Sequence, residues 1–71
     1  MKTNQFIENK KNYYGENINL IYHDGSSYIG VYHSYTTAVD NDPDGESITL
    51  LMPDGGQTEY FTDEIKEILL A

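Results

Sequence analysis

Three aspartates at alternate positions, Asp40, Asp42 and Asp44, stand directly before Gly45. This order matches the opening of a calcium-binding loop, in which alternate carboxylates converge on one hard cation and a glycine allows a sharp turn. The twelfth position counted from Asp40 is Leu51, not the bidentate glutamate that completes such a loop. A solvated turn is therefore the favoured interpretation, with weak calcium binding at the three aspartates as the alternative.

Tyrosine is the second group of interest, because seven tyrosines occur and several fall on segments with strand periodicity. Aromatic strand surfaces can stack bases, line protein interfaces or form a half-buried sheet wall with their hydroxyls in water. A base-stacking site also needs a cationic groove, which this chain does not supply. The structural wall is favoured, and a protein interaction surface made of Tyr28, Tyr32 and Tyr35 is the main alternative.

Two histidines, His23 and His33, fall on neighbouring predicted strands, where imidazoles could bind zinc or act as a general base. Neither belongs to a known ligand pattern, so structural or surface roles are favoured. The sequence has no nucleophile elbow, no phosphate-binding glycine loop and no HExxH motif. We therefore expect a non-enzymatic protein that needs no cofactor.

The net charge of −8 is distributed unevenly along the chain. Residues 1–15 hold three lysines and one glutamate, a balance of +2, whereas residues 16–71 hold eleven acids and one lysine, a balance of −10. The chain also has no arginine. An acidic majority repels a phosphate backbone, so Lys2, Lys10 and Lys11 are the only candidates for nucleic-acid contact.

A length of 71 residues fits one domain over 1–71. A chain of this size buries a small core, which makes oligomerisation a plausible source of further stability. There are no cysteines, and hence no disulfides. No stretch has the length or apolarity of a signal peptide or a membrane span. The default expectation is a cytoplasmic protein without membrane contact.

Residues 3–14 have apolar side chains at three-to-four spacing, which predicts a short amphipathic helix. Thr3 or Asn4 can cap its start, and Gly15 can supply the left-handed residue that ends it. Such a short helix is not stable alone. It must therefore pack its apolar side, which includes Phe6, against the rest of the domain.

From residue 17 the apolar period changes to two, which predicts β-strands. Asp24-Gly25 is a hairpin signal, and Gly30 within the second strand indicates a bend or a bulge. Ile65 and Ile68 have helical spacing, so 65–70 is either a fifth strand or a short terminal helix. The predicted strands are 17–23, 27–35, 47–52 and 57–61, followed by one helical turn at 62–64 and the segment 65–70.

The stretch Ile18-Asn19-Leu20-Ile21-Tyr22-His23-Asp24-Gly25, followed by Gly30, resembles the first strand, turn glycine and bending glycine of the Sm-like family. Ser47-Ile48-Thr49-Leu50-Leu51 resembles the third strand of that family. Tyr60-Phe61-Thr62-Asp63-Glu64-Ile65-Lys66-Glu67-Ile68 resembles its fourth strand, one-turn connector and fifth strand. The resemblance covers nearly the whole chain. It implies a mostly β fold in which a short N-terminal helix precedes a five-stranded, strongly bent antiparallel barrel over about 17–70, either Sm-like or SH3-like.

The RNA-contacting motifs of the Sm-like family do not carry over to this chain. Bacterial members have Tyr-Lys-His where this chain has Tyr60-Phe61-Thr62, and the Arg-Gly of archaeal and eukaryotic members is also missing. Function depends on the site more than on the fold, so the resemblance implies the fold without the usual RNA chemistry. It also implies assembly, because Sm-like proteins form rings by joining edge strands.

Three functions are compatible with these observations. The first is a non-enzymatic β-barrel protein that self-associates, or docks on another protein, through edge strands and tyrosine-rich surface. The second is an Sm-like RNA-binding module that uses Lys2, Lys10 and Lys11 on the N-terminal helix. The third is an acidic mimic of nucleic acid that occupies a basic cleft on a host protein.

Overall fold

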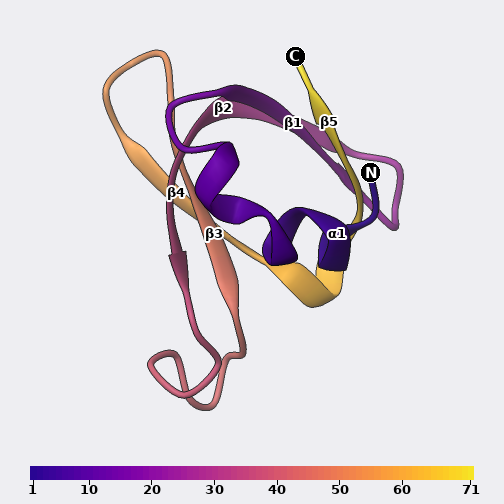
Figure 1. The fold of residues 1–71 in the computed structure, drawn as a ribbon, viewed down its shortest axis with the longest axis vertical. Helices are drawn as coiled ribbons and strands as arrows, with labels where there is room; N and C mark the ends of the chain where they lie inside the picture. Colours follow the sequence, from indigo (N-terminus) through magenta and orange to yellow (C-terminus); the bar gives the residue numbers. More distant parts are fainter.

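The computed structural model describes all 71 residues and has a mostly β fold. Five antiparallel strands form one sheet, and a single short α-helix precedes them (Figure 1). The predicted strands are confirmed, and the ambiguous segment 65–70 is a strand. The elements, including two 3-10 turns named η1 and η2, are α1 (Thr3–Glu8), η1 (Lys10–Asn12), β1 (Asn17–Tyr22), β2 (Ser27–Thr36), β3 (Ser47–Leu51), β4 (Gln57–Phe61), η2 (Thr62–Glu64) and β5 (Ile65–Leu70).

The strand order in the sheet is β4-β3-β2-β1-β5. The long β2 pairs with β1 through its first half and with β3 through its second half, and Val31 is paired on both sides, with Asn17 and with Leu51. Figure 1 shows β2 as a curved ribbon that carries the sheet around the core. No pairing joins β4 to β5, so the sheet is not closed into the predicted barrel and both outer strands are edges.

Gly30 lies on the inner side of β2, where the chain passes close to β3. A Cβ atom at this position would stand 3.0 Å from Leu50 Cβ and 3.0 Å from the carbonyl oxygen of Leu51. The glycine is therefore needed for close approach of the two strands. The register shift in β2 lies elsewhere, between Tyr32 and Ser34.

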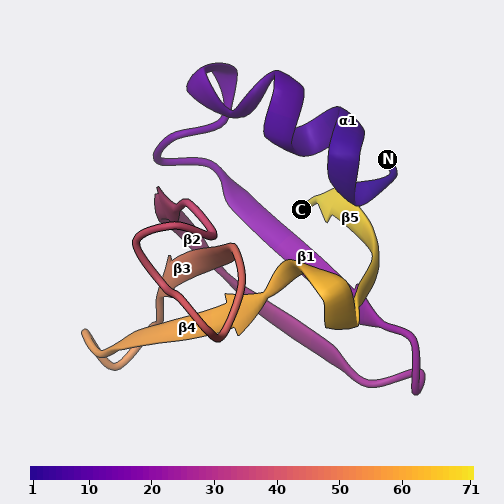
Figure 2. The same cartoon turned by 90° about the horizontal axis from the view of Figure 1, so that it is seen from below.

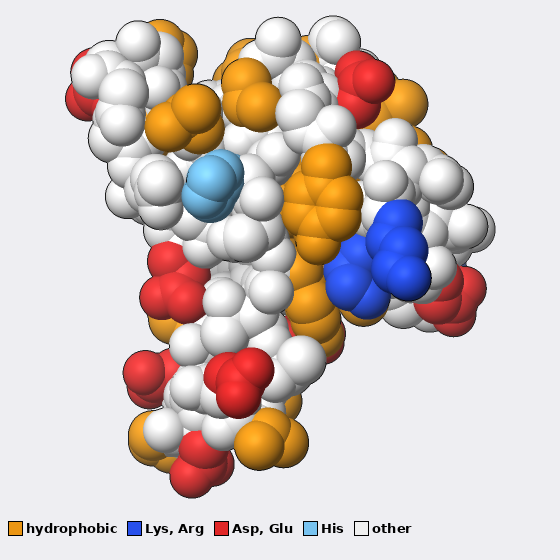
Figure 3. Space-filling view, turned by 60° about the vertical axis from the view of Figure 1, so that its left-hand side comes forward, with side chains coloured by type: hydrophobic (Ala, Val, Ile, Leu, Met, Phe, Trp, Pro, Cys, Tyr) orange, Lys and Arg blue, Asp and Glu red, His pale blue; other side chains and the backbone are white.

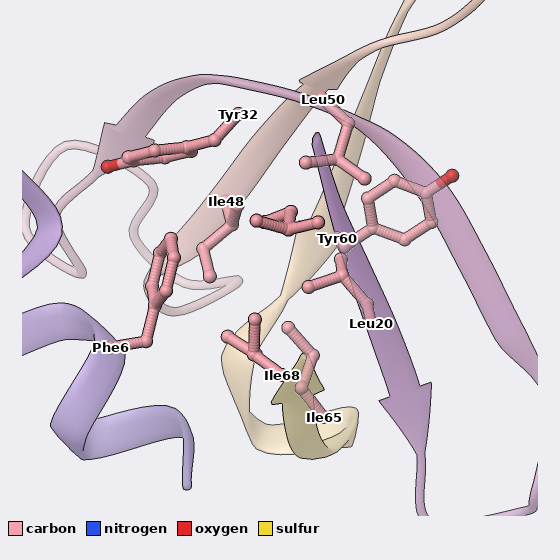
Figure 4. Close-up of a cluster of buried hydrophobic side chains, with 9 residues drawn as sticks. Phe6, Leu20, Tyr32, Ile48, Leu50, Tyr60, Ile65 and Ile68 are labelled. Carbon is pink, nitrogen blue, oxygen red and sulfur yellow. The ribbon is translucent and has the colours of Figure 1, made fainter. Parts of the chain in front are cut away.

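The core consists of nine apolar side chains on the inner side of the curved sheet. Figure 2 shows α1 lying across one side of this sheet, and Figure 4 shows Phe6 pointing from α1 toward the strands. The Phe6 ring meets Tyr32 edge-on, with centroids 5.0 Å apart. The buried set is Phe6, Ile18, Leu20, Tyr32, Ile48, Leu50, Tyr60, Ile65 and Ile68.

The predicted N-terminal helix is wrong in its length, because α1 ends at Glu8. Asn9 Nδ2 donates to the Gln5 carbonyl at 2.9 Å, and the Asn9 backbone N–H turns to Phe6 O at 3.1 Å. In a continued α-helix, the Gln5 carbonyl would accept from the Asn9 backbone N–H. Here the Asn9 side chain uses that carbonyl instead, and the chain tightens into η1. Gly15 has a positive φ of 82°, as predicted for the residue that ends the segment.

The predicted helix caps are also wrong. The N-cap position is Lys2, whose backbone N–H donates to Gln5 Oε1 at 2.9 Å. Thr3 is inside the helix, and its Oγ1 donates instead to Ile65 O at 3.0 Å. The Thr3 side chain therefore fixes α1 to β5 and does not cap the helix.

Candidate functional site

The edge of β4 presents backbone groups that no other strand of the chain uses. The Thr62 N–H donates to Glu46 O at 3.1 Å. Glu46 and Thr62 are therefore a hydrogen-bonded pair at one end of the β3–β4 ladder. Bonded and non-bonded pairs alternate in an antiparallel ladder. The backbone N–H and C=O groups of Gln57, Glu59 and Phe61 therefore point away from β3, along an open edge.

The edge of β5 is partly covered by the start of the chain. The Ala71 N–H donates to Asn17 O at 2.9 Å, so the same alternation turns the backbone groups of Ile68 and Leu70 outward. The Ile68 N–H donates to Met1 O at 2.8 Å, and Ile68 O accepts from the Met1 amino nitrogen at 2.6 Å. Met1 thus occupies the middle of this edge, while Leu70 lies beyond it.

A polar network connects the loop between β2 and β3 to the β4 edge. Ser47 is fully buried, and its Oγ donates to Glu59 Oε2 at 2.6 Å. Asn41 Nδ2 donates to Ser47 Oγ at 2.8 Å and to Glu59 Oε2 at 3.1 Å. These bonds hold the Glu59 carboxylate at the side of β4 and orient the loop.

A second network joins β2, β3 and η2 around Glu46. The Tyr35 hydroxyl donates to Glu46 Oε2, and Thr62 Oγ1 donates to Glu46 Oε1 at 2.8 Å. The hydrogen bond to Glu46, together with burial, raises the pKa of Tyr35 to about 12. This network stabilises the connection that carries the chain from one edge strand to the other.

A pocket of about 350 Å³ lies between the β1–β2 turn and η2. The His23 N–H donates to Glu64 O at 3.0 Å and so holds the two segments together. The Tyr22 and Tyr28 rings meet edge to face with centroids 5.0 Å apart. Burial, and then the charge of Glu64, raises the pKa of Tyr22 to about 12. The lining residues are Tyr22, His23, Asp24, Tyr28, Asp63 and Glu64.

The three tyrosines predicted as an interaction surface do not form one. Tyr32 is buried in the core, with 1% of its surface exposed, and so cannot contact a partner. Tyr28 is half-buried and contributes to the pocket, whereas Tyr35 is half-buried and bonded to Glu46. The register shift after Tyr32 adds one residue to β2 and places Tyr35 opposite Ile48, so these tyrosines belong mainly to the sheet wall.

The acidic loop does not assemble a metal site. Asp40, Asp42 and Asp44 are exposed, and Asp40 Oδ2 accepts a hydrogen bond from Thr37 Oγ1 at 3.1 Å. No group of three or more His, Cys, Asp or Glu side chains in the chain could hold a metal ion. The structure thus gives no support to the calcium interpretation.

Lys2 stands at the start of α1 and Lys10 and Lys11 lie in η1, whereas His23 and His33 belong to the hairpin of β1 and β2. Lys10 Nζ stands 4.9 Å from the centre of the Tyr35 ring, whereas Lys2 and Lys11 are exposed. Figure 3 shows lysine side chains gathered beside hydrophobic ones on one face, with acidic side chains spread around them. The β1–β2 register places His23 and His33 toward opposite ends of the hairpin, so they cannot share a ligand.

Sequence reasoning missed the pocket and both polar networks. The approach of Glu64 to Tyr22 depends on a long-range contact that no local pattern signals. No family model, curated protein or solved structure matches the chain. None of its helices has the length and apolarity needed to cross a membrane.

Proposed function

We propose that this is a non-enzymatic small β protein that self-associates, with the β4 edge of one copy pairing with the β5 edge of the next. The observation that carries the proposal is the pair of unjoined edges at β4 and β5. An open edge with outward N–H and C=O groups is a template for another strand. The proposal includes an Sm-like architecture, which the N-terminal helix and the curved five-stranded sheet support.

Pairing between unlike edges fits the side chains better than pairing between two β4 strands. A two-fold pairing centred on Glu59 would place two carboxylates directly opposite each other, which is destabilising. The β5 edge instead carries Lys66 next to Glu67, so its own charges balance. Because two different surfaces then meet, the contact is heterologous and generates a ring when the rotation closes.

Assembly by this route must release Met1 from Ile68. The two hydrogen bonds that Met1 makes with the β5 edge would be replaced by two from the incoming β4 strand. This exchange keeps the number of backbone hydrogen bonds unchanged. The net gain comes from Leu70 and its neighbours, whose backbone and apolar side chains become covered.

Light scattering on the purified protein, at several concentrations, tests the proposal directly. A mass of about five to seven times 8.1 kDa is expected for a closed Sm-like ring. Gln57→Pro removes an N–H that points away from β3, so it should abolish assembly while circular dichroism shows a retained fold. The matched control Gln57→Thr keeps the N–H and should assemble. A monomeric wild-type protein, or a Gln57→Pro variant that still assembles, overturns the proposal.

RNA binding is a second candidate, favoured by one observation. Tyr14 is 51% exposed and stacks on Tyr32 with centroids 4.7 Å apart, close in sequence to Lys10 and Lys11. An exposed ring beside cationic groups suits single-stranded nucleic acid. This function predicts binding that falls steeply with salt and weakens in a Lys10→Glu/Lys11→Glu double variant. Unchanged binding in that variant contradicts it.

A further inference from the structure

We propose that the pocket between the β1–β2 turn and η2 binds an alkylammonium cation, with a preference for quaternary ammonium groups. The pocket is defined by Tyr22, His23, Asp24, Tyr28, Asp63 and Glu64. This binding function is separate from self-association and does not depend on it.

The aromatic part of the pocket supplies the first requirement of such a site. Tyr22 and Tyr28 both line it and are half-buried. Behind them, the buried Tyr60 ring lies 5.0 Å from Tyr28 and 6.2 Å from Tyr22, measured between centroids. The two lining rings are therefore held in place by packing. Electron-rich faces of tyrosine attract cations, and quaternary ammonium recognition is the best-known use of this interaction.

The carboxylates supply the second requirement, which is negative charge on more than one side. Asp24 comes from the β1–β2 turn, whereas Asp63 and Glu64 come from η2. The His23 N–H to Glu64 O bond of 3.0 Å holds the turn and η2 together. None of the four lysines lines the pocket, so no internal ammonium group competes for these carboxylates there.

The dimensions distinguish an organic cation from a metal ion. No group of three or more acidic or histidine side chains that could hold a metal ion is present, so the geometry offers no ready-made site for a bare ion. A space of about 350 Å³ lies at the lower end of the range for small-molecule sites. A weakly hydrated organic cation can enter it and contact both the rings and the carboxylates that line it.

Titration with tetramethylammonium chloride, followed by amide NMR shifts of the full chain, is the primary test. We expect saturable shifts centred on His23, Tyr28 and Glu64, with a dissociation constant on the order of millimolar. The neutral, similarly sized tert-butanol is the matched probe and should cause no comparable shifts. Equal responses to the two compounds would show simple apolar contact and overturn the proposal.

Two variants locate the interaction in the pocket. Glu64→Gln should weaken tetramethylammonium binding about twofold to fivefold, whereas Glu16→Gln, an identical charge change on an exposed residue outside the pocket, should leave it unchanged. Tyr28→Leu should weaken binding by a similar factor, and Tyr28→Phe, which keeps the ring, should restore it. Binding that survives both Glu64→Gln and Tyr28→Leu refutes the site.

Two further arms distinguish the source of the cation. Choline represents a free small quaternary ammonium compound, and a short peptide with one trimethyl-lysine represents a protein side chain. Tighter binding of the peptide assigns the pocket to a lysine-bearing partner, and tighter binding of choline assigns it to a small molecule. Repeating the titration on Gln57→Pro separates the result from self-association, because a monomer must bind equally well. Failure of both compounds to bind overturns the proposal.

Discussion

Replacing Gly30 with alanine tests the close packing that bends the sheet. The added Cβ would lie 3.0 Å from both Leu50 Cβ and the Leu51 carbonyl oxygen, where ordinary contacts begin at 3.4 Å. Gly30 does not have a positive φ, so crowding alone opposes the change. Overpacking of this kind costs about 1 to 3 kcal/mol, and the lower chain entropy of alanine in the unfolded state offsets about 0.4 to 1 kcal/mol.

We therefore expect Gly30→Ala to lower the free energy of unfolding by about 1.3 kcal/mol from the middle of both ranges, and by at most about 2.6 kcal/mol. Urea denaturation followed by circular dichroism measures this difference, and the melting temperature should fall by about 4 to 8 °C per kcal/mol. Gly56→Ala is the matched control. Its Cβ would meet only the Asp54 side chain on an exposed turn, with Oδ1 at 3.1 Å, and this oxygen also accepts from the Gly56 N–H at 2.8 Å. Equal stability of the two variants would refute the packing argument.

Two further predictions concern the core and the network around Glu46. Leu20→Ala should cost about 2 to 5 kcal/mol of unfolding free energy because Leu20 is fully buried; Leu69→Ala, at a 42% exposed position, should cost under about 1 kcal/mol in the same urea experiment. Glu46→Gln removes the charged acceptor that, with burial, raises the pKa of Tyr35 to about 12, so ultraviolet titration should show this pKa falling toward 10. The folded-state pKa of Tyr35 exceeds its unfolded value, so its contribution to stability is intact below pH 10 and is lost as the pH rises toward 12. If raising the pH from about 10 to about 12 lowers the stability of the wild-type protein no more than that of Glu46→Gln, this assignment is contradicted.

The strands were predictable because their signals are local. Asp24-Gly25 indicated the first hairpin, and Gly25 does adopt a positive φ of 90° there. The alternation of Ile18 and Leu20 with polar neighbours placed both on one face, and both are fully buried. Successive side chains of a strand point to opposite faces of the sheet. An alternating apolar pattern therefore predicts a strand wherever one face of the sheet is covered.

The fifth strand was ambiguous for a physical reason. Ile65 and Ile68 are three residues apart, which would place them on opposite faces of a regular strand but on one face of a helix. The register shift at Ile21/Tyr22 leaves Lys66 without a partner on β1, and this bulge turns both isoleucines inward. A bulged strand can thus imitate helical spacing, and the pairing with β1 resolves the choice.

The pocket could not be predicted, because it depends on contacts between distant segments. Tyr22 and Glu64 are far apart in the sequence, and each has a sufficient local explanation, as a strand residue and as an acid in a helical turn. They meet only because β5 returns to pair with β1, which brings η2 beside the first hairpin. The residue types were visible in the sequence, but their association was not.

The surface of β5 joins the arguments about stability and assembly. Only 11 of the 71 residues are buried, which is a small core for an independent domain. Meanwhile Leu69 and Leu70 are 42% and 54% exposed on an edge strand whose middle is covered only by Met1. An edge that combines outward backbone groups with exposed leucines gains both hydrogen bonds and apolar burial when another strand is added. Self-association at β5 would therefore compensate for the small core.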